Sequence, residues 1–468
     1  MKLFAIILIV LGVSGLQAQE IQLSGHVESG DVGSLVRVQV YTDPFSKQIK
    51  TLASTQTDST GNFSLHFSVP YITTAFIKFG LKKGEFVLRP GGRYHFLIHT
   101  DSSGQMGSVF DQMPLSMNLN AQDGSLNKHI GQFNEEYNTF VLKHFKDIYL
   151  YHRKEVLEQF EQHIAREFST DTTSYFKQFT RYSLASLVWA GRMKSTEKIA
   201  SSYFIGQKVY YHNKQYADFL RGFMLAHFES NIDSPVNKSN LIELVPFRNL
   251  KSLDSLFSLD SLFAKDRRIR ELAEMIIMGK NYHDQALTTA DFDALFKEMA
   301  ASSHYEQNRN IAAAYLIRLR QMGRGTPAPK IHLPDFMGDE YTLSDFKNKF
   351  VLLSFFKADC PVCEGHLPFL KNLQEQLGTD FTNVTIWVGK TPKQMIQRVL
   401  SGTYKWPFLL LGKRFAVLEQ YQVLTFPSYV LIAPDGNIAM APAPMPEEDA
   451  LRRIRLFQQA YEKSHLKK

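Results

Sequence analysis

The chain has 468 residues, of which 44% are hydrophobic and 21% are charged, a composition typical of folded domains and not of extended disorder. At roughly 100–200 residues per domain, this length indicates about three domains. The net charge of +7, from 53 basic and 46 acidic residues, is spread along the chain and forms no basic stripe, so we expect no nucleic-acid partner.

Residues 1–18 have the pattern of a signal peptide. Lys2 supplies the positive start, an apolar run continues to Val13, and small residues lead to a cleavage point after Ala18. The apolar run is too short to span a bilayer comfortably, so we expect export to the periplasm. Leu16 does not suit the cleavage motif, which leaves an uncleaved, membrane-associated form as the alternative.

Residues 19–103 carry the period-two pattern of β-strands. Apolar and polar residues alternate over 21–26, 36–41 and 63–67, and turn-forming residues separate these stretches. Short strands at this spacing predict a small β-sandwich. Residues 104–124 are rich in Ser, Gly, Met and Asn, and we expect them to form a linker.

Residues 125–323 are expected to form an α-helical domain. Thr288 and Asp291 have the spacing of a capping box at the start of one helix. Apolar stripes at helical spacing favour a helix–helix core over a ligand groove. The residues of these stripes include Leu253, Leu256, Phe257, Leu259, Leu262, Phe263, Ile311, Tyr315, Ile317 and Leu319.

Residues 324–468 contain both cysteines of the chain. The apolar run 350–356 predicts a buried central strand, Cys360 and Cys363 follow it, and residues 364–377 fit a helix. Two cysteines three positions apart close almost no loop, so a bridge between them would stabilise the fold little. Their spacing therefore indicates chemistry and not structural cross-linking.

A strand–CxxC–helix order suits thiol–disulfide exchange. Cys360 would lie at the helix N-terminus, where unpaired N–H groups and the helix dipole favour a thiolate, the nucleophilic form. Cys363 would lie one turn inside the helix, from where it can resolve a mixed disulfide. Asp359, beside the first cysteine, works against thiolate formation.

Five motifs succeed one another in this region. They are Pro-Ala-Pro at 327–329, Leu-Pro-Asp-Phe at 333–336, Leu-Ser-Asp-Phe at 343–346, the CxxC pair, and Phe426-Pro427 before an expected strand at 428–432. In this order they resemble the TlpA/ResA-type branch of the thioredoxin family. The resemblance implies an α/β thioredoxin fold, oxidoreductase activity on protein disulfides, no bound cofactor and recharging by a membrane-embedded electron donor. It also implies that Pro427 follows a cis peptide bond beside the cysteine pair.

Three positions depart from the family pattern. The usual Trp before the first cysteine is Asp359, and the usual buried Asp or Asn six residues before that cysteine is Ser354. The usual Glu three residues after the second cysteine is His366. Because His366 and Cys363 are one helical turn apart, we expect His366 to tune the pair in place of the carboxylate.

Two other functions stay open at this point. Cys360, Cys363 and His366 are candidate ligands for copper or zinc, although their spacing suggests no fourth ligand. The residues before 324 could instead make the chain a binding or scaffold protein that docks a partner. Within the redox interpretation, we expect a reductase or isomerase and not a primary oxidant, by analogy with the family.

Overall fold

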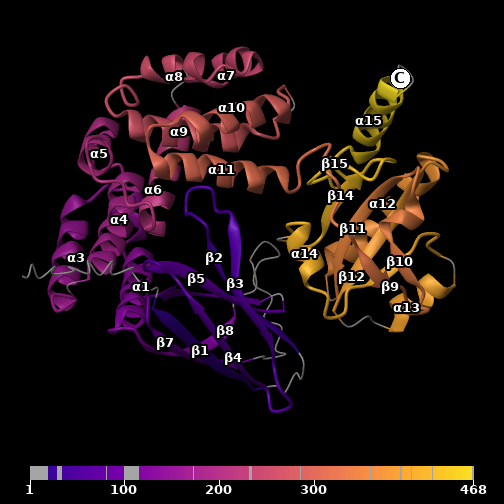
Figure 1. Cartoon of the computed structure of the whole chain (residues 1–468), viewed down its shortest axis with the longest axis horizontal. Coiled ribbons are helices and arrows are strands. Elements are labelled where there is room, and N and C mark those ends of the chain that lie inside the picture. Colours follow the sequence, from indigo (N-terminus) through magenta and orange to yellow (C-terminus); the bar gives the residue numbers. More distant parts are fainter. Residues whose placement is uncertain are drawn as a thin grey trace, which may run out of the picture.

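The computed structural model describes residues 19–28, 34–80, 82–99, 115–171, 173–230, 234–284, 286–358, 360–389, 393–401, 403–423 and 425–465. The signal peptide predicted at 1–18 and Asp359 lie outside these residues. The chain folds into a β-rich part, a helical part and a C-terminal α/β part (Figure 1). The predicted multidomain fold class is confirmed.

The β-rich part is a sandwich of two four-stranded sheets, ordered β4-β1-β7-β8 and β3-β2-β5-β6. Alternate residues of the strands point inward and form one apolar core, as the period-two pattern predicts. The strands are β1 (Glu20–Val27), β2 (Leu35–Tyr41), β3 (Ile49–Gln56), β4 (Asn62–Ser68), β5 (Thr73–Phe79), β6 (Lys82–Leu88), β7 (Arg93–His99) and β8 (Ser116–Gln122).

Strand β8 lies in a segment predicted to be a linker, and this prediction is wrong for residues 116–122. The strand pairs antiparallel with β7 along its whole length. Met117, Leu119 and Ala121 are half-buried against the sandwich core. The intervening Ser and Asn residues have low β propensity and hide this alternation, whereas backbone pairing with β7 compensates for it.

The helical part contains α1 to α11, and its large apolar core confirms that the aromatic stripes are packing surfaces. Thr288 and Asp291 form the predicted capping box. The helices are α1 (Leu126–Lys143), α2 (Phe145–Tyr149), α3 (Lys154–Glu167), α4 (Ser174–Ala190), α5 (Thr196–Tyr203), α6 (Lys214–Ser230), α7 (Lys238–Leu244), α8 (Leu250–Ser258), α9 (Arg267–Asn281), α10 (Thr289–Ser302) and α11 (Glu306–Arg320).

Two residues assigned to the apolar stripes are exposed. Leu259 is 69% exposed because α8 ends at Ser258, so the helical period does not continue to Leu262. Ile317 is 61% exposed because it faces away from the side of α11 that buries Tyr315.

The C-terminal part is a five-stranded sheet ordered β13-β12-β11-β14-β15, preceded by the β9-β10 hairpin. The predicted central strand and the strand after Pro427 both form. The strands are β9 (His332–Pro334), β10 (Glu340–Thr342), β11 (Phe350–Lys357), β12 (Phe381–Val388), β13 (Phe408–Leu410), β14 (Ser428–Ile432) and β15 (Ile438–Met440). The helices are α12 (Pro361–Gln376), α13 (Lys393–Leu400), α14 (Ala416–Gln420) and α15 (Ala450–His465). Among the described residues, no helix has the length and apolarity needed to cross a membrane.

The loop between β2 and β3 anchors the sandwich to the helices (Figure 1). Phe45, at its tip, is fully buried in the core of the helical part. The Phe45 carbonyl accepts hydrogen bonds from Tyr315 of α11, at 2.9 Å, and from Arg221 of α6. Asp43 holds the loop by accepting the backbone N–H groups of Phe45 and Ser46. The two N-terminal parts therefore share a core.

The C-terminal part contacts the sandwich through Glu419 of α14. The Glu419 carboxylate pairs with Arg37 of β2, at 2.7 Å, and with Lys78 of β5. The three side chains are 11–25% exposed, so solvent screens this cluster less than it would an open surface pair. This contact ties the C-terminal part to the sandwich.

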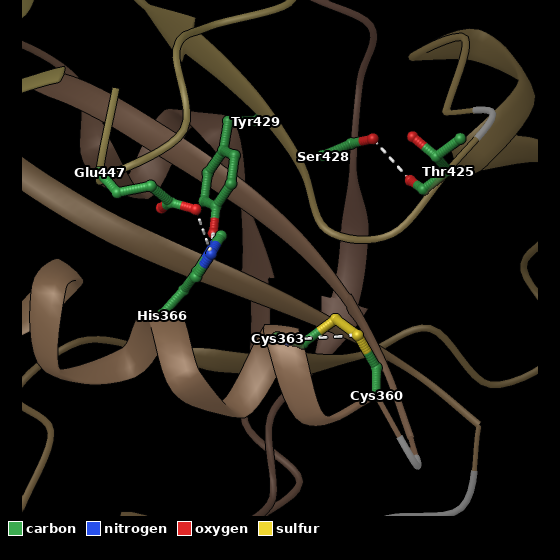
Figure 2. Close-up of a disulfide and its surroundings, with 7 residues drawn as sticks. All are labelled: Cys360, Cys363, His366, Thr425, Ser428, Tyr429 and Glu447. Carbon is green, nitrogen blue, oxygen red and sulfur yellow. Dashed lines mark hydrogen bonds and ion pairs between the residues drawn. A yellow bond between two sulfur atoms is a disulfide. The ribbon is translucent and has the colours of Figure 1, made fainter. Parts of the chain in front are cut away.

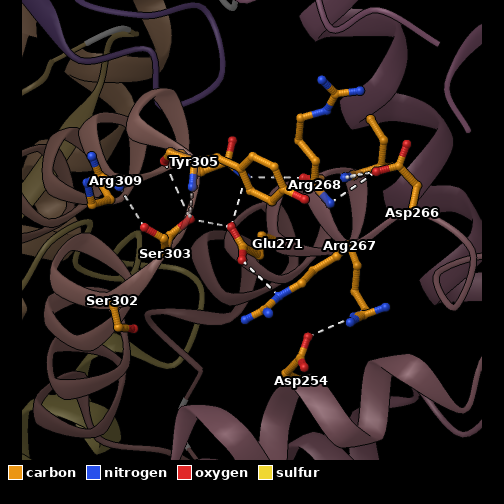
Figure 3. A network of polar contacts seen from close by, with 12 residues as sticks. Asp254, Asp266, Arg267, Arg268, Glu271, Ser302, Ser303, Tyr305 and Arg309 are labelled. Carbon is orange, nitrogen blue, oxygen red and sulfur yellow. Dashed lines mark hydrogen bonds and ion pairs between the residues drawn. The ribbon is translucent and has the colours of Figure 1, made fainter. Parts of the chain in front are cut away.

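Helix α9 carries two buried carboxylates with different surroundings. Glu271 accepts hydrogen bonds from Ser303 at 2.5 Å and Asn308 at 3.0 Å, and its second oxygen lies 3.4 Å from Arg267 (Figure 3). Glu274 is fully buried, and its carboxyl group faces that of Asp254. Burial, followed by the charges of Asp254 and Glu271, raises the pKa of Glu274 well above its ordinary value.

The substitution Glu274→Gln tests this carboxyl group. Because the pKa of Glu274 is raised in the folded chain, the folded chain keeps a proton that the unfolded chain releases. The stability that Glu274 contributes is therefore complete below the ordinary glutamate pKa, and it is lost as pH rises toward the raised pKa. The amide does not titrate, so we expect the variant to gain on the order of 1–3 kcal/mol of stability over the wild type between acid and neutral pH. Urea unfolding followed by far-UV circular dichroism measures this difference.

The exposed pair of Glu229 and Lys280 provides the matched control. Glu229→Gln should shift stability by less than about 0.5 kcal/mol at each pH. An equal pH dependence for the wild type and Glu274→Gln would show that Glu274 does not change its protonation on unfolding.

Candidate active site

The start of α12 places the two cysteines. Strand β11 is buried along nearly its whole length, and α12 begins at Pro361, a residue suited to the first helical position because it lacks an N–H group. Cys360 is the residue before the helix, and its sulfur accepts the backbone N–H of Cys363 at 3.2 Å. The sulfur of Cys360 thus acts as a helix cap.

Cys360 and Cys363 form a disulfide, with their Cα atoms 5.3 Å apart (Figure 2). The two residues differ in exposure: Cys363 is fully buried, whereas Cys360 is only partly buried. A partner molecule can therefore reach the first sulfur more easily than the second.

The peptide bond between Phe426 and Pro427 is cis, as predicted. Strand β14 begins at the next residue, Ser428, whose hydroxyl donates a hydrogen bond to the carbonyl of Thr425 at 2.6 Å. Figure 2 shows this turn on the side of the disulfide that faces away from α12. Phe426 and Cys360 are both partly buried and pack against the apolar core of the C-terminal part.

His366 lies on α12, one turn after Cys363, and is 5% exposed. Its Nδ1 is 2.7 Å from the hydroxyl of Tyr429 on β14, and its Nε2 is 2.9 Å from the carboxylate of Glu447 (Figure 2). Both ring nitrogens thus have partners other than a cysteine. A carboxylate therefore lies next to His366, but it belongs to Glu447, in the segment before α15, and not to a residue of α12.

Ser354 occupies the centre of β11, in register with Tyr429 on β14 and Thr385 on β12. It is fully buried, and its hydroxyl has no hydrogen-bond partner among the described residues. The position that carries an acid or amide in the resembled family therefore holds a small neutral group that cannot remove a proton from a thiol at neutral pH.

The alternative metal site is not supported by the structure. Within the described ranges, no group of three or more His, Cys, Asp or Glu side chains is arranged to hold a metal ion. Cys360 and Cys363 are joined to each other, and His366 points to Tyr429 and Glu447.

Tyr429 and Glu447 are neighbours of His366 that the sequence alone does not predict. Tyr429 follows the predicted cis proline by two positions, and this placement was the only local signal for it. Glu447 follows a Pro-rich stretch at 442–446 and is one of three consecutive acidic residues, a pattern typical of the start of a helix.

Comparisons with known proteins agree with this geometry. Residues 324–450 match the model of the Redoxin family. The thioredoxin-like protein YneN of Bacillus subtilis is 27% identical over 115 residues, which make up 24% of this chain and 68% of that protein. The thiol-disulfide oxidoreductase ResA of Geobacillus kaustophilus is 26% identical over 134 residues, or 28% of this chain and 75% of that protein. Among solved structures, the thioredoxin domain of a thiol-disulfide oxidoreductase from Bacteroides vulgatus is 28% identical and covers 29% of this chain and 97% of its own, with a TM-score of 0.26.

The C-terminal part has a thioredoxin-like fold, and the relatives that it resembles are named thioredoxin-like proteins or thiol-disulfide oxidoreductases. The chain carries a Redoxin domain at its C-terminus, and the predicted resemblance and enzyme class are confirmed. The catalytic roles of Cys360, Cys363, Pro427 and His366 stay predictions.

The difference in exposure predicts which thiol reacts first. In the reduced protein, the N–H groups of α12 stabilise a thiolate at Cys360, whereas Cys363 is enclosed. We expect iodoacetamide at neutral pH to modify Cys360 at least about tenfold faster than Cys363. Mass spectrometry of the alkylated peptides measures both rates.

The variants Cys360→Ser and Cys363→Ser, each with one thiol, provide the controls. Only the variant that retains Cys360 should react quickly. Equal rates in the two variants would show that position on the helix does not distinguish the thiols.

Proposed function

We propose that this protein exchanges thiols with disulfides in exported protein substrates through Cys360 and Cys363, as a reductase or isomerase. The observation that supports this most directly is the disulfide at the N-terminus of α12, in which Cys360 is partly exposed and Cys363 is fully buried. A cross-link that closes so short a loop contributes little to stability, so its use is chemical.

The reaction balances with the two thiols alone. The Cys360 thiolate attacks one sulfur of a substrate disulfide, and the other substrate sulfur leaves with the electron pair and takes up a proton. Cys363 then attacks the sulfur of Cys360, the second substrate thiol departs, and the enzyme disulfide forms. The substrate gains two electrons, and the enzyme disulfide must be reduced again before the next cycle.

Apolar side chains beside the disulfide suit a protein substrate. Val362, between the two cysteines, is 45% exposed, and Phe369, two turns along α12, is 48% exposed. Pro361, Gly365 and Pro368 are also exposed on this helix. A small apolar surface next to the reactive sulfur can pack against a polypeptide that presents its disulfide there.

The protein is exported, and a separate donor reduces its disulfide again. The signal-peptide pattern of residues 1–18 supports a periplasmic location. The chain has only two cysteines, so it contains no second pair that could pass electrons to the first. A separate protein must therefore reduce it, and a membrane-embedded electron donor fits an exported enzyme.

Trapping tests the substrate step. The variant Cys363→Ser cannot resolve a mixed disulfide, so exported proteins should accumulate as covalent partners of Cys360, visible on non-reducing gels and lost with reductant. The variant with both cysteines replaced by serine is the control and should trap nothing. If both variants give the same set of covalent partners on the gels, dithiol exchange is contradicted and a binding or scaffold function is favoured.

The reduction potential tests the direction. We expect a value near that of thioredoxin, about −270 mV, and a mostly reduced protein in cells, because a reductant must be held in its dithiol form. Equilibration with glutathione and thiol trapping in cells measure these two quantities. A potential near about −120 mV, with mostly oxidised protein, would identify a primary oxidant instead.

A further inference from the structure

His366 joins three segments that are distant in the sequence (Figure 2). It belongs to α12, its Nδ1 meets Tyr429 of β14 at 2.7 Å, and its Nε2 meets Glu447, before α15, at 2.9 Å. We call these three side chains the His366 clamp. The His366 side chain is 6% exposed, whereas that of Glu447 is 44% exposed, so the clamp runs from the interior to the surface.

The protons of the clamp can be assigned from its chemistry. Burial, followed by the charge of Glu447, raises the pKa of Tyr429 well above its ordinary value, so its hydroxyl keeps its proton. Tyr429 can therefore donate to Nδ1 of a neutral imidazole, whose Nε2–H then donates to Glu447. An imidazolium would keep both contacts, because the tyrosine oxygen can also accept. The clamp thus survives either state of His366.

The clamp spans the two surfaces that border the disulfide. His366 is one turn from Cys363 on α12, and Tyr429 is two residues after the cis bond that ends the turn at 425–427. Other polar side chains on α12, such as Gln374, bond to β12 and not to β14. Among the described residues, the contact between His366 and Tyr429 is the side-chain hydrogen bond that joins α12 to β14.

We propose that Glu447 is a positioning residue for substrate proteins: by orienting His366, it sets the spacing between the N-terminus of α12 and the turn before β14. This inference rests on the proposed dithiol exchange. A polypeptide must lie against both surfaces while its disulfide meets Cys360, whereas a small disulfide needs only the sulfur. The clamp therefore affects large and small substrates differently.

The test compares two disulfides with the full-length protein. Insulin is reduced in turnover, with dithiothreitol as the reductant that restores the enzyme dithiol, and the small aromatic disulfide 5,5′-dithiobis(2-nitrobenzoate) reacts in a single turnover with the pre-reduced protein. Glu447→Ala removes the hydrogen-bond acceptor, and we expect kcat/KM for insulin to fall about tenfold, mainly through KM, the effect of losing one charge-assisted hydrogen bond. The rate with the small disulfide should stay within about twofold. Glu447→Gln keeps an oxygen that accepts Nε2–H and should recover most of the insulin activity.

Glu448→Ala is the matched control, because Glu448 is the exposed neighbour whose carboxylate accepts the N–H of Met445 and does not contact His366. It should behave as the wild type with both disulfides. Tyr429→Phe removes the other end of the clamp and should reproduce the selective loss with insulin.

Three outcomes would overturn the inference: no change in Glu447→Ala, an equal loss with both disulfides, or an equal loss in Glu448→Ala. An equal loss with both disulfides would indicate general destabilisation of the domain. If the wild-type dithiol reacts with neither disulfide, the proposed function itself fails, which distinguishes the two failures.

Discussion

The unpaired N–H groups at the start of α12 are the constraint on which the redox site depends. Strand β11 is buried in the centre of the sheet and ends shortly before Cys360, so the helix must begin where the chain leaves the sheet. The sulfur of Cys360 accepts one of these N–H groups, and the same geometry encloses Cys363 in the first turn. One structural requirement therefore produces both the accessible and the buried sulfur.

The parts before the redox domain form a single frame. Phe45 extends from the sandwich into the helical core, where its carbonyl accepts hydrogen bonds from two helices, so neither part buries its surface alone. The redox domain joins this frame through the half-buried cluster of Glu419, Arg37 and Lys78. A contact of this kind depends on charge complementarity, which orients two folded parts without merging their cores.

Much of the fold could be predicted because its signals are local. The strands of the sandwich alternate with the period of two that strand geometry sets. The capping box at Thr288, the buried β11 and the strand after Pro427 each depend on a few neighbouring residues. The predictions from the sequence were wrong where tertiary contacts or the end of a helix override the local residue pattern. Strand β8 forms despite unfavourable residues because β7 offers a backbone to pair with, and Leu259 leaves the core because α8 stops one residue earlier.

The candidate site could likewise be predicted from the sequence only in part. The sequence alone determined the strand–CxxC–helix order, the cis proline and the place of His366 one turn after Cys363, because each follows from neighbouring residues or from a motif. Only the tertiary structure decided what His366 contacts. Tyr429 and Glu447 reach it from other segments, through the packing of β14 and of the chain before α15 against α12. No local period encodes such contacts, since they depend on how distant segments meet around a shared core.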